Sequence, residues 1–443
     1  MTKVITYGTY DLLHYGHKRL LERAKALGDY LIVGVTSDDF DRARGKINVQ
    51  QSFMERVEGV RATGLADEII AEEYEGQKID DIKRYGVDIF AIGSDWKGKF
   101  DYLEEYCKVV YLDRTQGISS TEIRSEERSL RIGLVGNYFS ILHKFYNESK
   151  FVNGVSVSGI YSDDPQSLKD KLTVYSSYED LLDNSDAVYI TSLPKFHYQQ
   201  IHTALEHGKH VLCESPICLE VSQWDELQKL AKEKNCLLID SLKTAYSLAY
   251  SRLLLLAKGG KIGNIVSVDA TCTSMSELQK GTPKLDKLWN SINAWGPTAL
   301  LPVFQLLGTD FKQMNIMTHY LDKAIDFDAF TKVSFIYPHA VASIKVGQGV
   351  KSEGELIISG TQGYIYVPAP WWKTDYFEIR YENPVDNKRF FYQLDGEGIR
   401  YEIVSFSKAV ESKHNARYIE GDISEGFVKV MESYNGKENL IEI

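Results

Sequence analysis

The stretch Gly8-Thr9-Tyr10-Asp11-Leu12-Leu13-His14-Tyr15-Gly16-His17 decides the fold of the first part of the chain. It follows a β-branched run, Val4–Thr6, and leads into a helical pattern over Lys18–Leu27, which predicts a strand, a turn and a helix. The two histidines share one face of the opening helical turn, and the glycine between them lets a ligand approach the backbone. Imidazoles beside a helix N-terminus suit the negative charge that grows on a pentavalent α-phosphate group and on departing pyrophosphate during nucleotidyl transfer. Two surface histidines in a turn would give the same pattern.

Two later stretches carry related chemistry. Arg114-Thr115-Gln116-Gly117-Ile118-Ser119-Ser120-Thr121 comes directly after a predicted strand at Val109–Leu112; an arginine, a glycine turn and hydroxyls before a helix favour phosphate binding. Gly93-Ser94-Asp95-Trp96-Lys97-Gly98-Lys99 also follows a predicted strand, Ile89–Ile92. Parallel strands place their ligands at their carboxyl ends, so we expect the three stretches to meet at one edge of a sheet.

The pattern of strands and helices starts twice and then changes. Strand-like and helical runs alternate to about residue 128, and a fresh strand and turn begin at Arg131-Ile132-Gly133-Leu134-Val135-Gly136. After Ile262 the runs become longer and strand-like, and a helix is expected around Glu425–Tyr434. The predicted fold class is α/β: a Rossmann-like domain over 1–128, a second Rossmann domain over 129–260, and an open-sheet α/β domain over 261–443.

The composition excludes several classes of protein. The 443 residues include 51 Lys plus Arg and 62 Asp plus Glu, a net charge of −11, so no nucleic-acid partner is expected. No apolar run is long enough to span a bilayer, and no secretory signal opens the sequence. The five cysteines form no C-x-x-C pair, which favours reduced thiols in a cytoplasmic protein without a membrane partner.

Tyr7–His17, Gly93–Phe100 and Arg114–Thr121 resemble the motifs of the glycerol-3-phosphate cytidylyltransferases, within the H-x-G-H nucleotidyltransferase superfamily. The resemblance covers about residues 1–128. It implies transfer of CMP from CTP to a polyol phosphate, with glycerol 3-phosphate as the default acceptor, to give a CDP-alditol and pyrophosphate for teichoic-acid-like polymers or capsules. We infer Mg²⁺ as the counterion of the triphosphate, and no metal ligand can be named.

The same resemblance implies a role for each matching residue. His14 and His17 would stabilise the transition state, with Lys46 and Arg114 as further catalytic cations. Asp11 would brace the histidine loop, and Lys78 would contact the phosphate of the acceptor; without the resemblance, Lys78 reads as an ordinary solvated lysine at a helix start. The implied nucleotide-binding residues are Thr9, Tyr10, Asp11, Gly16, Arg44, Asp95, Trp96, Thr115, Gly117, Ile118, Ser119, Ser120 and Thr121.

Residues from about 131 to 443 resemble the glucose–fructose oxidoreductase/inositol dehydrogenase family. The resemblance is carried by Tyr178–Leu182, by Ile190–Pro194 with His197, and by Gly208–Pro216. It implies a Rossmann domain followed by an open-sheet domain. Three features depart from the family, as follows: Tyr138 stands at the second glycine of the dinucleotide-binding turn, Ser215 replaces a lysine that binds substrate and assists proton transfer, and Trp295–Gln305 offers no histidine or carboxylate.

Three functions remain open at this point. The leading interpretation is a homodimeric cytidylyltransferase whose oxidoreductase-like region has lost redox chemistry, binds NAD(P) weakly or not at all, and serves dimerisation, acceptor delivery or effector binding. The second is a bifunctional enzyme that reduces a ketose phosphate with NAD(P)H to supply the alditol phosphate. The third is a nucleotide-sensing assembly protein without catalysis, against which the intact His14, His17 and Arg114 argue.

Overall fold

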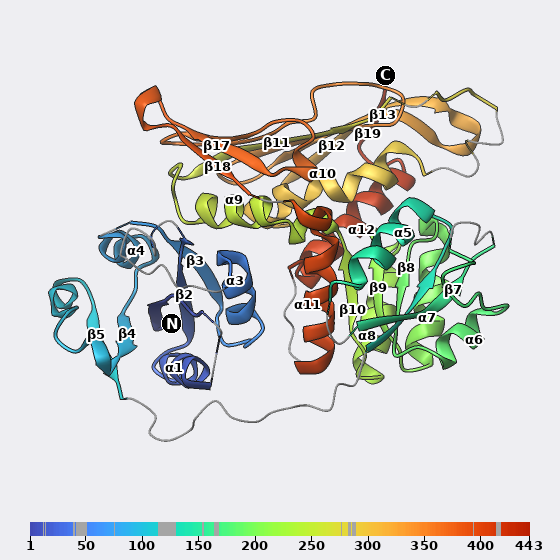
Figure 1. Cartoon of the computed structure of the whole chain (residues 1–443). Helices are drawn as coiled ribbons and strands as arrows, with labels where there is room; N and C mark the ends of the chain where they lie inside the picture. The colour runs from blue at the N-terminus through green and yellow to red at the C-terminus, as the bar shows by residue number, and fades with distance from the viewer. Residues whose placement is uncertain are drawn as a thin grey trace. The chain divides into compact units, whose positions relative to one another are not determined.

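The computed structural model describes residues 1–443 except 12, 14, 39, 41–50, 75, 114–129, 153–154, 164–167, 276, 282–284, 286–288, 393 and 413–417. The chain folds as two compact units (Figure 1). Unit 1 comprises Met1–Glu126 with Glu411–Ala416, and unit 2 comprises Glu127–Val410 with Arg417–Ile443. One sheet belongs to unit 1 and two sheets belong to unit 2 among the described residues.

Unit 1 is built on a five-stranded parallel sheet with the order β3-β2-β1-β4-β5. Its strands are β1 (Lys3–Gly8), β2 (Tyr30–Thr36), β3 (Glu68–Glu72), β4 (Ile89–Gly93) and β5 (Lys108–Leu112). Its helices are α1 (Tyr15–Lys25), α3 (Phe53–Arg61) and α4 (Gln77–Tyr85), with the 3-10 turns η1 (Ser94–Trp96) and η2 (Asp101–Glu105). The central strands are apolar and buried, because helices cover a parallel sheet on both faces.

The order of the strands reverses between β1 and β4. The chain passes from β1 to β2 on one side, and the later strand β4 pairs with β1 on the other. Gly8 at the end of β1 pairs with Val35, and Gly93 at the end of β4 pairs with Leu112. The carboxyl ends of β1, β4 and β5 therefore lie along one edge, at a switch point of the kind where open α/β sheets bind ligands.

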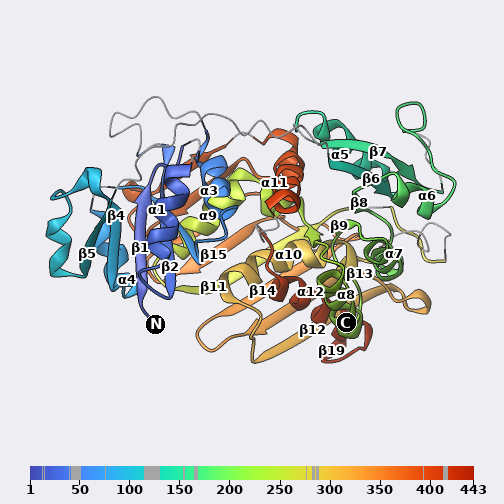
Figure 2. The ribbon, with the colours of Figure 1, turned by 90° about the horizontal axis from the view of Figure 1, so that it is seen from below.

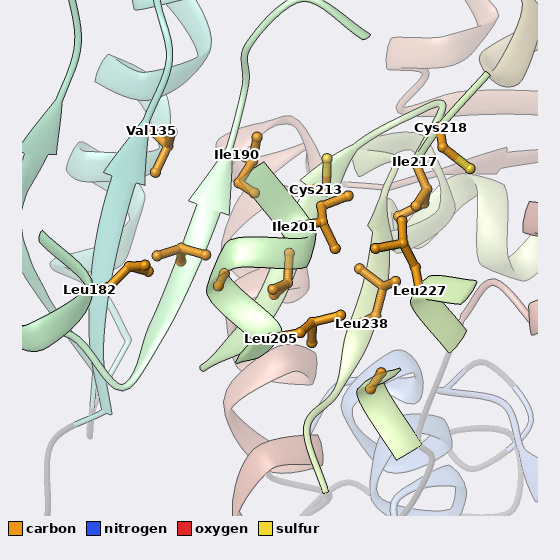
Figure 3. Packing of buried hydrophobic residues seen from close by; sticks show 14 of the residues in the cluster. Val135, Leu182, Ile190, Ile201, Leu205, Cys213, Ile217, Cys218, Leu227 and Leu238 are labelled. Atoms are coloured by element: carbon orange, nitrogen blue, oxygen red, sulfur yellow. The ribbon is translucent and has the colours of Figure 1, made fainter. Parts of the chain in front are cut away.

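Unit 2 begins with a second five-stranded parallel sheet, in the order β10-β9-β8-β6-β7. Its strands are β6 (Leu130–Val135), β7 (Val155–Tyr161), β8 (Ala187–Ile190), β9 (His210–Glu214) and β10 (Leu238–Ser241). Its helices are α5 (Phe139–Ser149), α6 (Tyr178–Asp183), α7 (Pro194–Glu206) and α8 (Val221–Glu233). On one face of the sheet, Leu182, Ile201 and Leu227 from the helices pack against Val135 and Ile190 (Figure 3).

The remaining sheet has nine strands in the order β18-β17-β16-β15-β11-β14-β13-β12-β19. The strands are β11 (Ile265–Thr273), β12 (Gln313–Asp322), β13 (Phe327–Ile336), β14 (Val341–Gly347), β15 (Leu356–Gly360), β16 (Tyr364–Val367), β17 (Tyr376–Arg380), β18 (Lys388–Phe391) and β19 (Leu440–Glu442). Buried and partly buried residues alternate along much of β13, as in a sheet whose two faces are covered unequally. That cover includes α10 (Ser291–Leu307), which lies along β11 and β14 (Figure 2). The helices α9 (Leu248–Lys258) and α12 (Gly421–Asn435) pack against α10.

The predicted α/β fold class is confirmed: two parallel Rossmann-like sheets are followed by a mixed sheet. The elements that were not predicted include the strands β12, β18 and β19 and the helix α11 (Ile399–Ser412). The helix α11 inserts Ile399, Ile403 and Phe406 into the core formed by β6, α5 and β8. A late part of the chain therefore completes the core on one face of the Rossmann sheet. The charged residues Glu122–Leu130 also predict a helix, but this stretch lies outside the described residues except for Leu130, which begins β6. The boundaries at 128 and 260 stay predictions.

None of the described helices is long and apolar enough to cross a membrane. The five cysteines all lie in the described part of the chain, and each is a free thiol.

Two glycines of unit 1 give a matched test of its packing. A Cβ on Gly34 in β2 would lie 2.2 Å from Cδ1 of Tyr7, whereas a Cβ on Gly59 in α3 would meet Leu13 Cβ at 3.5 Å. We expect Gly34→Ala to lower the free energy of unfolding of unit 1 by about 1–3 kcal/mol. Gly59→Ala should raise it by about 0.5–1 kcal/mol, because alanine is the better helix former. Hydrogen exchange on β1 and β2 peptides measures both, and equal effects would contradict the prediction.

Candidate functional site

Two of the three predicted stretches, Gly8–His17 and Gly93–Lys99, lie at the carboxyl edge of the unit 1 sheet. Thr9, Tyr10 and Asp11 follow β1 directly, and η1 follows β4, the strand that pairs with β1. The third stretch, Arg114–Thr121, lies outside the described residues, although β5 ends beside β4 at Leu112. Helix α1 begins at Tyr15, so the N-terminus of this helix lies at the same edge. An anion placed there would meet backbone donors and a favourable helix dipole.

Tyr10 packs against His17, the one of the two predicted catalytic histidines that lies among the described residues. Its ring is 1 % exposed and lies under Gly8, where a Cβ would come within 2.9 Å of Tyr10 Cζ. The ring meets His17 edge-on, with 5.5 Å between the ring centroids. Tyr10 keeps a left-handed backbone, with φ of 56°, which a bulky residue adopts only where its surroundings hold it. Tyr10 is therefore placed to position His17 rather than to reach a ligand from the surface.

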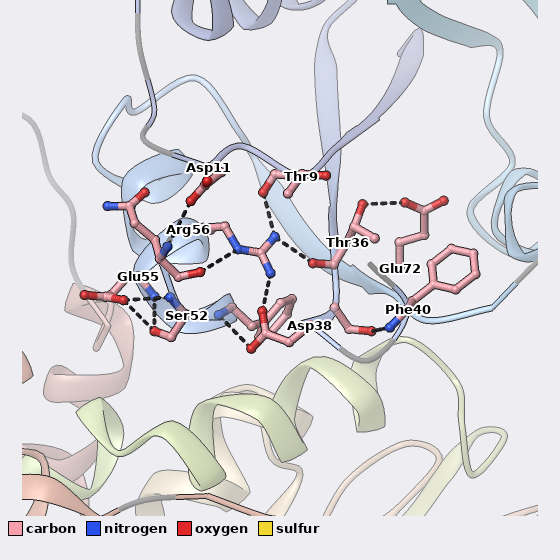
Figure 4. Close-up of polar contacts among 12 residues, drawn as sticks. Thr9, Asp11, Thr36, Asp38, Phe40, Ser52, Glu55, Arg56 and Glu72 are labelled. Atoms are coloured by element: carbon pink, nitrogen blue, oxygen red, sulfur yellow. Dashed lines mark hydrogen bonds and ion pairs between the residues drawn. The ribbon is translucent and has the colours of Figure 1, made fainter. Parts of the chain in front are cut away.

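Arg56 ties the loop after β1 to the rest of the sheet edge (Figure 4). The side chain is fully buried in α3. Nη1 donates to the carbonyl of Thr9 at 2.7 Å and to that of Thr36 at 2.8 Å, and Nη2 donates to Asp38 Oδ1 at 2.5 Å. Nε donates to the carbonyl of Gln51 at 3.2 Å. The sequence analysis did not identify this residue; its signal is a charged residue among the apolar positions Phe53, Met54, Val57 and Val60 of α3.

The start of α3 also anchors the loop that carries the histidines. Oδ1 of Asp11 accepts a hydrogen bond from the Gln51 N–H at 2.9 Å. Ser52 then caps α3, and its hydroxyl accepts from the Glu55 N–H while the Glu55 carboxylate accepts from the Ser52 N–H. This capping box fixes where the helix starts. The contact ties Asp11 to the start of α3; the bracing role that the resemblance implies for Asp11 stays a prediction.

Lys78 lies at the start of α4, and its ammonium faces an acid and two rings. It forms an ion pair with Glu72, the last residue of β3. Its Nζ lies 4.7 Å from the ring centroid of Tyr7 and 5.4 Å from that of Phe100. The lysine side chain is 12 % exposed and that of Glu72 is 2 % exposed. Lys78 is therefore a held cation close to the stretch after β4, not a solvated lysine.

Trp96 in η1 is the exposed aromatic residue of this edge. Its ring is 40 % exposed, the Lys99 ammonium lies 5.1 Å from its centroid, and Phe100 packs against it. An exposed indole beside a cation offers a stacking face for a planar ligand such as a base. The side chain of Asp95 is not among the parts of the chain that the structure describes.

The described residues thus locate part of the predicted site. Thr9, Tyr10, Asp11, Gly16, His17 and Trp96 lie in the loops after β1 and β4 or in the first turn of α1, and Lys78 lies near them. The predicted residues outside the described part are His14, Arg44, Lys46, Arg114, Thr115, Gly117, Ile118, Ser119, Ser120 and Thr121. Within the described residues, no three His, Cys, Asp or Glu side chains converge as a metal site would require.

Unit 2 contains a cavity of about 1180 Å³ lined by the turn after β6 and by residues that follow β8, β9 and β10. Gly136 is required in that turn, since a Cβ would lie 2.7 Å from the Ser192 nitrogen. Tyr138 lines the cavity and is 53 % exposed, with its ring centroid 6.1 Å from that of Trp289. Ser215 and Lys243 line the same cavity. The turn after β6 therefore still borders an open cavity although Tyr138 stands at a glycine position. Lys243, which the sequence analysis did not consider, lines this cavity.

Glu214 lines this cavity, and the buried carboxyl groups of Asp240 and Glu402 lie near it. Glu214 accepts a hydrogen bond from the Tyr189 hydroxyl, and the Ser241 hydroxyl donates to Glu402 at 2.9 Å. Burial raises the pKa of Glu214 and of Glu402, and it raises the pKa of Asp240 to about 7. The two ring nitrogens of His197 lie 2.8 Å and 2.9 Å from the carbonyl oxygens of Pro216 and Ser192, which are acceptors for its ring N–H, and burial lowers its pKa. Hydrogen bonds within the fold therefore hold Glu214, Glu402 and His197 in place.

Comparison with known proteins agrees with both folds. The cytidylyltransferase-like family model matches residues 5–126, and the model of the oxidoreductase family with an NAD-binding Rossmann fold matches residues 130–240. The glycerol-3-phosphate cytidylyltransferase of Bacillus spizizenii is 53 % identical over 130 residues, which are 29 % of this chain and 100 % of that protein. The Staphylococcus aureus enzyme of the same name is 47 % identical over 28 % of this chain and 95 % of its own length.

Solved structures match unit 2 in fold. KijD10, a 3-ketoreductase from Actinomadura kijaniata solved with NADP and TDP-benzene, is 17 % identical and superposes with a TM-score of 0.63 over 71 % of this chain and 99 % of its own. An aldose-aldose oxidoreductase from Caulobacter crescentus is 16 % identical, with a TM-score of 0.61 over 70 % of this chain and 97 % of its own. At this identity the likeness establishes the architecture alone.

A parallel sheet with a histidine loop at its switch point defines unit 1 as a nucleotidyltransferase. The chain belongs to the cytidylyltransferase-like family, through a unit that matches glycerol-3-phosphate cytidylyltransferases over their whole length.

Arg56 gives a prediction for the stability of this site. Arg56→Met leaves the carbonyls of Thr9 and Thr36 and the carboxylate of Asp38 without their donor. We expect the free energy of unfolding of unit 1 to fall by about 3–5 kcal/mol. Hydrogen exchange on β1 and β2 peptides measures the loss. The control is Arg84→Met at the exposed end of α4, for which we expect a change within about 0.5 kcal/mol; similar losses in the two variants would contradict the assignment.

Proposed function

We propose that unit 1 transfers CMP from CTP to a polyol phosphate, with glycerol 3-phosphate as the first acceptor to test. The observation that carries this proposal is the placement of His17 in the first turn of α1, held by Tyr10, at the switch point between β1 and β4. The glycerol-3-phosphate cytidylyltransferases that match this unit over their whole length support the substrate class. The CDP-alditol product would serve teichoic-acid-like polymers or capsules.

The proposed step is a direct displacement at the α-phosphorus of CTP. A phosphate oxygen of the acceptor forms the new P–O bond, the bond to the β-phosphate breaks, and pyrophosphate leaves with the electron pair. No covalent bond to the enzyme is needed. His14 and His17, with the first turn of α1, would stabilise the charge on the oxygens of the transition state. Lys46 and Arg114 would hold the triphosphate, and Trp96 offers a stacking face for the cytosine.

The acceptor phosphate would share Lys78 with Glu72. The ammonium is already paired with that buried carboxylate and lies over the ring of Tyr7, so it is held in place before the acceptor arrives. A fixed cation costs less side-chain entropy on binding than a mobile surface lysine does.

The remaining predicted residues would complete the nucleotide site. They are Thr9, Asp11, Gly16 and Asp95, the hydroxyls of Ser119, Ser120 and Thr121, and the backbone of Thr115, Gly117 and Ile118.

The described residues fit Mg²⁺ as a companion of the substrate rather than as a resident ion. They contain no group of three potential ligands, and Mg²⁺ commonly binds through nucleotide phosphates and water with few protein carboxylates. The ion would neutralise the triphosphate and the departing pyrophosphate. The cations and the helix terminus of this chain orient the same oxygens.

The first experiment identifies the acceptor. The full chain is incubated with CTP, Mg²⁺ and phosphorylated glycerol, ribitol, arabinitol and hexitol isomers, and pyrophosphate release is measured. We expect release with at least one acceptor, glycerol 3-phosphate first, and CTP to be preferred over ATP. No release with CTP across the panel, together with release from another nucleotide, would overturn the proposed cytidylyl transfer.

The histidines give the second test of this function. We expect His14→Ala and His17→Ala each to lower kcat by on the order of 10²–10⁴, as the loss of a positioned transition-state donor does, while the chain stays folded. His207→Ala, at an exposed position after α7, is the matched control and should leave kcat unchanged. Near-normal turnover in either active-site variant would refute the location of the site.

For unit 2 we propose a retained oxidoreductase fold without redox chemistry. The support is local: Tyr138 occupies the glycine position at which a dinucleotide pyrophosphate approaches the turn, and Ser215 cannot supply the charge or the proton of a lysine. The alternative is reduction of a ketose phosphate with NAD(P)H, which would supply the alditol phosphate. One observation favours that alternative, since Lys243 lines the cavity with Ser215. Its ammonium is, however, paired with Glu397 at 2.5 Å.

Dinucleotide binding separates the two possibilities. We expect calorimetry to detect no binding of NADH or NADPH to the full chain at micromolar concentrations, and a ketose phosphate to cause no loss of nicotinamide absorbance. Tyr138→Gly is the matched variant, because it restores the open turn and should strengthen dinucleotide binding. Micromolar binding by the unchanged chain, or steady oxidation of NAD(P)H, would establish the bifunctional alternative instead.

A further inference from the structure

Three lysines of unit 2 converge on a single carboxylate at the wall of the cavity. Lys144 lies in α5, Lys243 in the 3-10 turn η3 (Lys243–Tyr246) and Lys373 in the 3-10 turn η6 (Trp371–Lys373), and all three line the cavity. Their ammonium nitrogens lie 2.8 Å, 2.5 Å and 3.3 Å, respectively, from oxygens of Glu397. The four residues come from four separate elements, so the cluster is made by the tertiary fold.

The turn that presents Glu397 is unusual. The 3-10 turn η8 (Asp395–Gly398) places Gly396, Glu397 and Gly398 in the left-handed region, with φ of 61°, 53° and 92°. Glycine accepts this backbone freely, but a glutamate does so only where other contacts hold it. The ion pairs with the three lysines are such contacts. Burial opposes ionisation of Glu397, yet the hydrogen bonds and charges of these lysines lower its pKa to about 2.

The charges of the cluster do not balance. One carboxylate faces three ammonium groups, and Lys195 lines the same cavity. Among the described residues, the structure gives Lys144, Lys243 and Lys373 no second carboxylate partner; Glu148, which is close in sequence to Lys144, is bound by Arg400 at 2.9 Å. Two other acidic residues line the cavity. Asp163 accepts a hydrogen bond from the Asn137 amide, and burial raises the pKa of Glu214, so the four lysines still outnumber the carboxylates. The cluster therefore keeps an excess of positive charge facing an open cavity.

We propose that this lysine cluster binds a phosphate monoester, and that Glu397 is an internal anion which occupies the site until the ligand displaces it. A dianionic phosphate offers three acceptor oxygens and more charge than one carboxylate, so it suits three ammonium donors better. Trp295 and Trp372 line the same cavity with 5.0 Å between their ring centroids, and they supply an apolar wall for the organic part of the ligand. The volume of about 1180 Å³ leaves room for that part.

The proposal goes beyond cytidylyl transfer and does not depend on it. A phosphate monoester could come from a polyol phosphate or from the 2′-phosphate of NADP, and both would present the same group to the lysines. The carbon skeleton differs, so the two sources are distinguished by the ligands that bind. Binding is read directly, without turnover by unit 1, and a failure here is therefore separate from a failure of the cytidylyltransferase proposal.

The test measures binding of inorganic phosphate and glycerol 3-phosphate to the full chain by calorimetry at constant ionic strength. Glu397→Gln removes the internal anion, and we expect it to tighten phosphate binding by about tenfold, as loss of a competing charge does. Lys243→Met with Lys373→Met should abolish that binding event while leaving any glycerol 3-phosphate site of unit 1. The controls are Glu233→Gln and Lys229→Met in α8, which change the same charges at an exposed pair and should have no effect.

A second measurement covers the case in which Glu397→Gln does not fold. In the unchanged chain, phosphate should raise the unfolding temperature of unit 2 more than chloride does at equal ionic strength, and the lysine double variant should lose that difference. Equal effects of the two anions, or unaltered phosphate binding in the lysine double variant, would overturn the proposal. Binding of NADPH but not NADH that requires the lysines would support the site, assign its phosphate to a dinucleotide, and contradict the proposed lack of dinucleotide binding.

Discussion

The buried guanidinium of Arg56 is the interaction on which the arrangement of unit 1 depends. It donates to the loop after β1, to the end of β2 and to the residue before the cap of α3. A planar group with five donors in a fixed fork can serve carbonyls and a carboxylate that lie in different directions, whereas a single ammonium cannot. Because the loop after β1 carries Tyr10 and leads to His17, the orientation of the candidate catalytic histidine follows from this contact.

Both units keep a cation at a candidate anion site by pairing it with a carboxylate of their own. In unit 1 the pair is Lys78 with Glu72, one charge against one, nearly buried over the ring of Tyr7. In unit 2 three ammonium groups share Glu397. In a neutral pair the carboxylate already balances the lysine, so an incoming anion is attracted only weakly. In an unbalanced cluster the excess positive charge attracts a second anion. The same chemistry therefore fits a positioning role in one unit and a ligand-responsive role in the other.

The sequence predicted those elements whose pattern is local. The parallel strands of both Rossmann-like sheets, and most strands of the mixed sheet, were found from short apolar or alternating runs, and the histidine loop was found because its residues are adjacent in the chain. Arg56 was missed because its one local signal, a charge among the apolar positions of α3, does not show which carbonyls and carboxylate it binds; these lie in other elements. Lys243 and Glu397 were missed for a related reason: their ion pair joins residues far apart in sequence, and only the packed tertiary structure brings them together.

The late position of α11 has a consequence for the making of this protein. The helix supplies Ile399, Ile403 and Phe406 to a core whose first strand begins at Leu130. At a synthesis rate of about 5–20 residues per second, the ribosome needs on the order of 10–50 s to deliver that helix after the strand has emerged. All five strands of the unit 1 sheet are synthesised long before α11. For that interval, one apolar face of the β6–β10 sheet has α5 but lacks the part of its cover that α11 supplies, and the nascent chain is a natural client for a chaperone that shields exposed apolar surface.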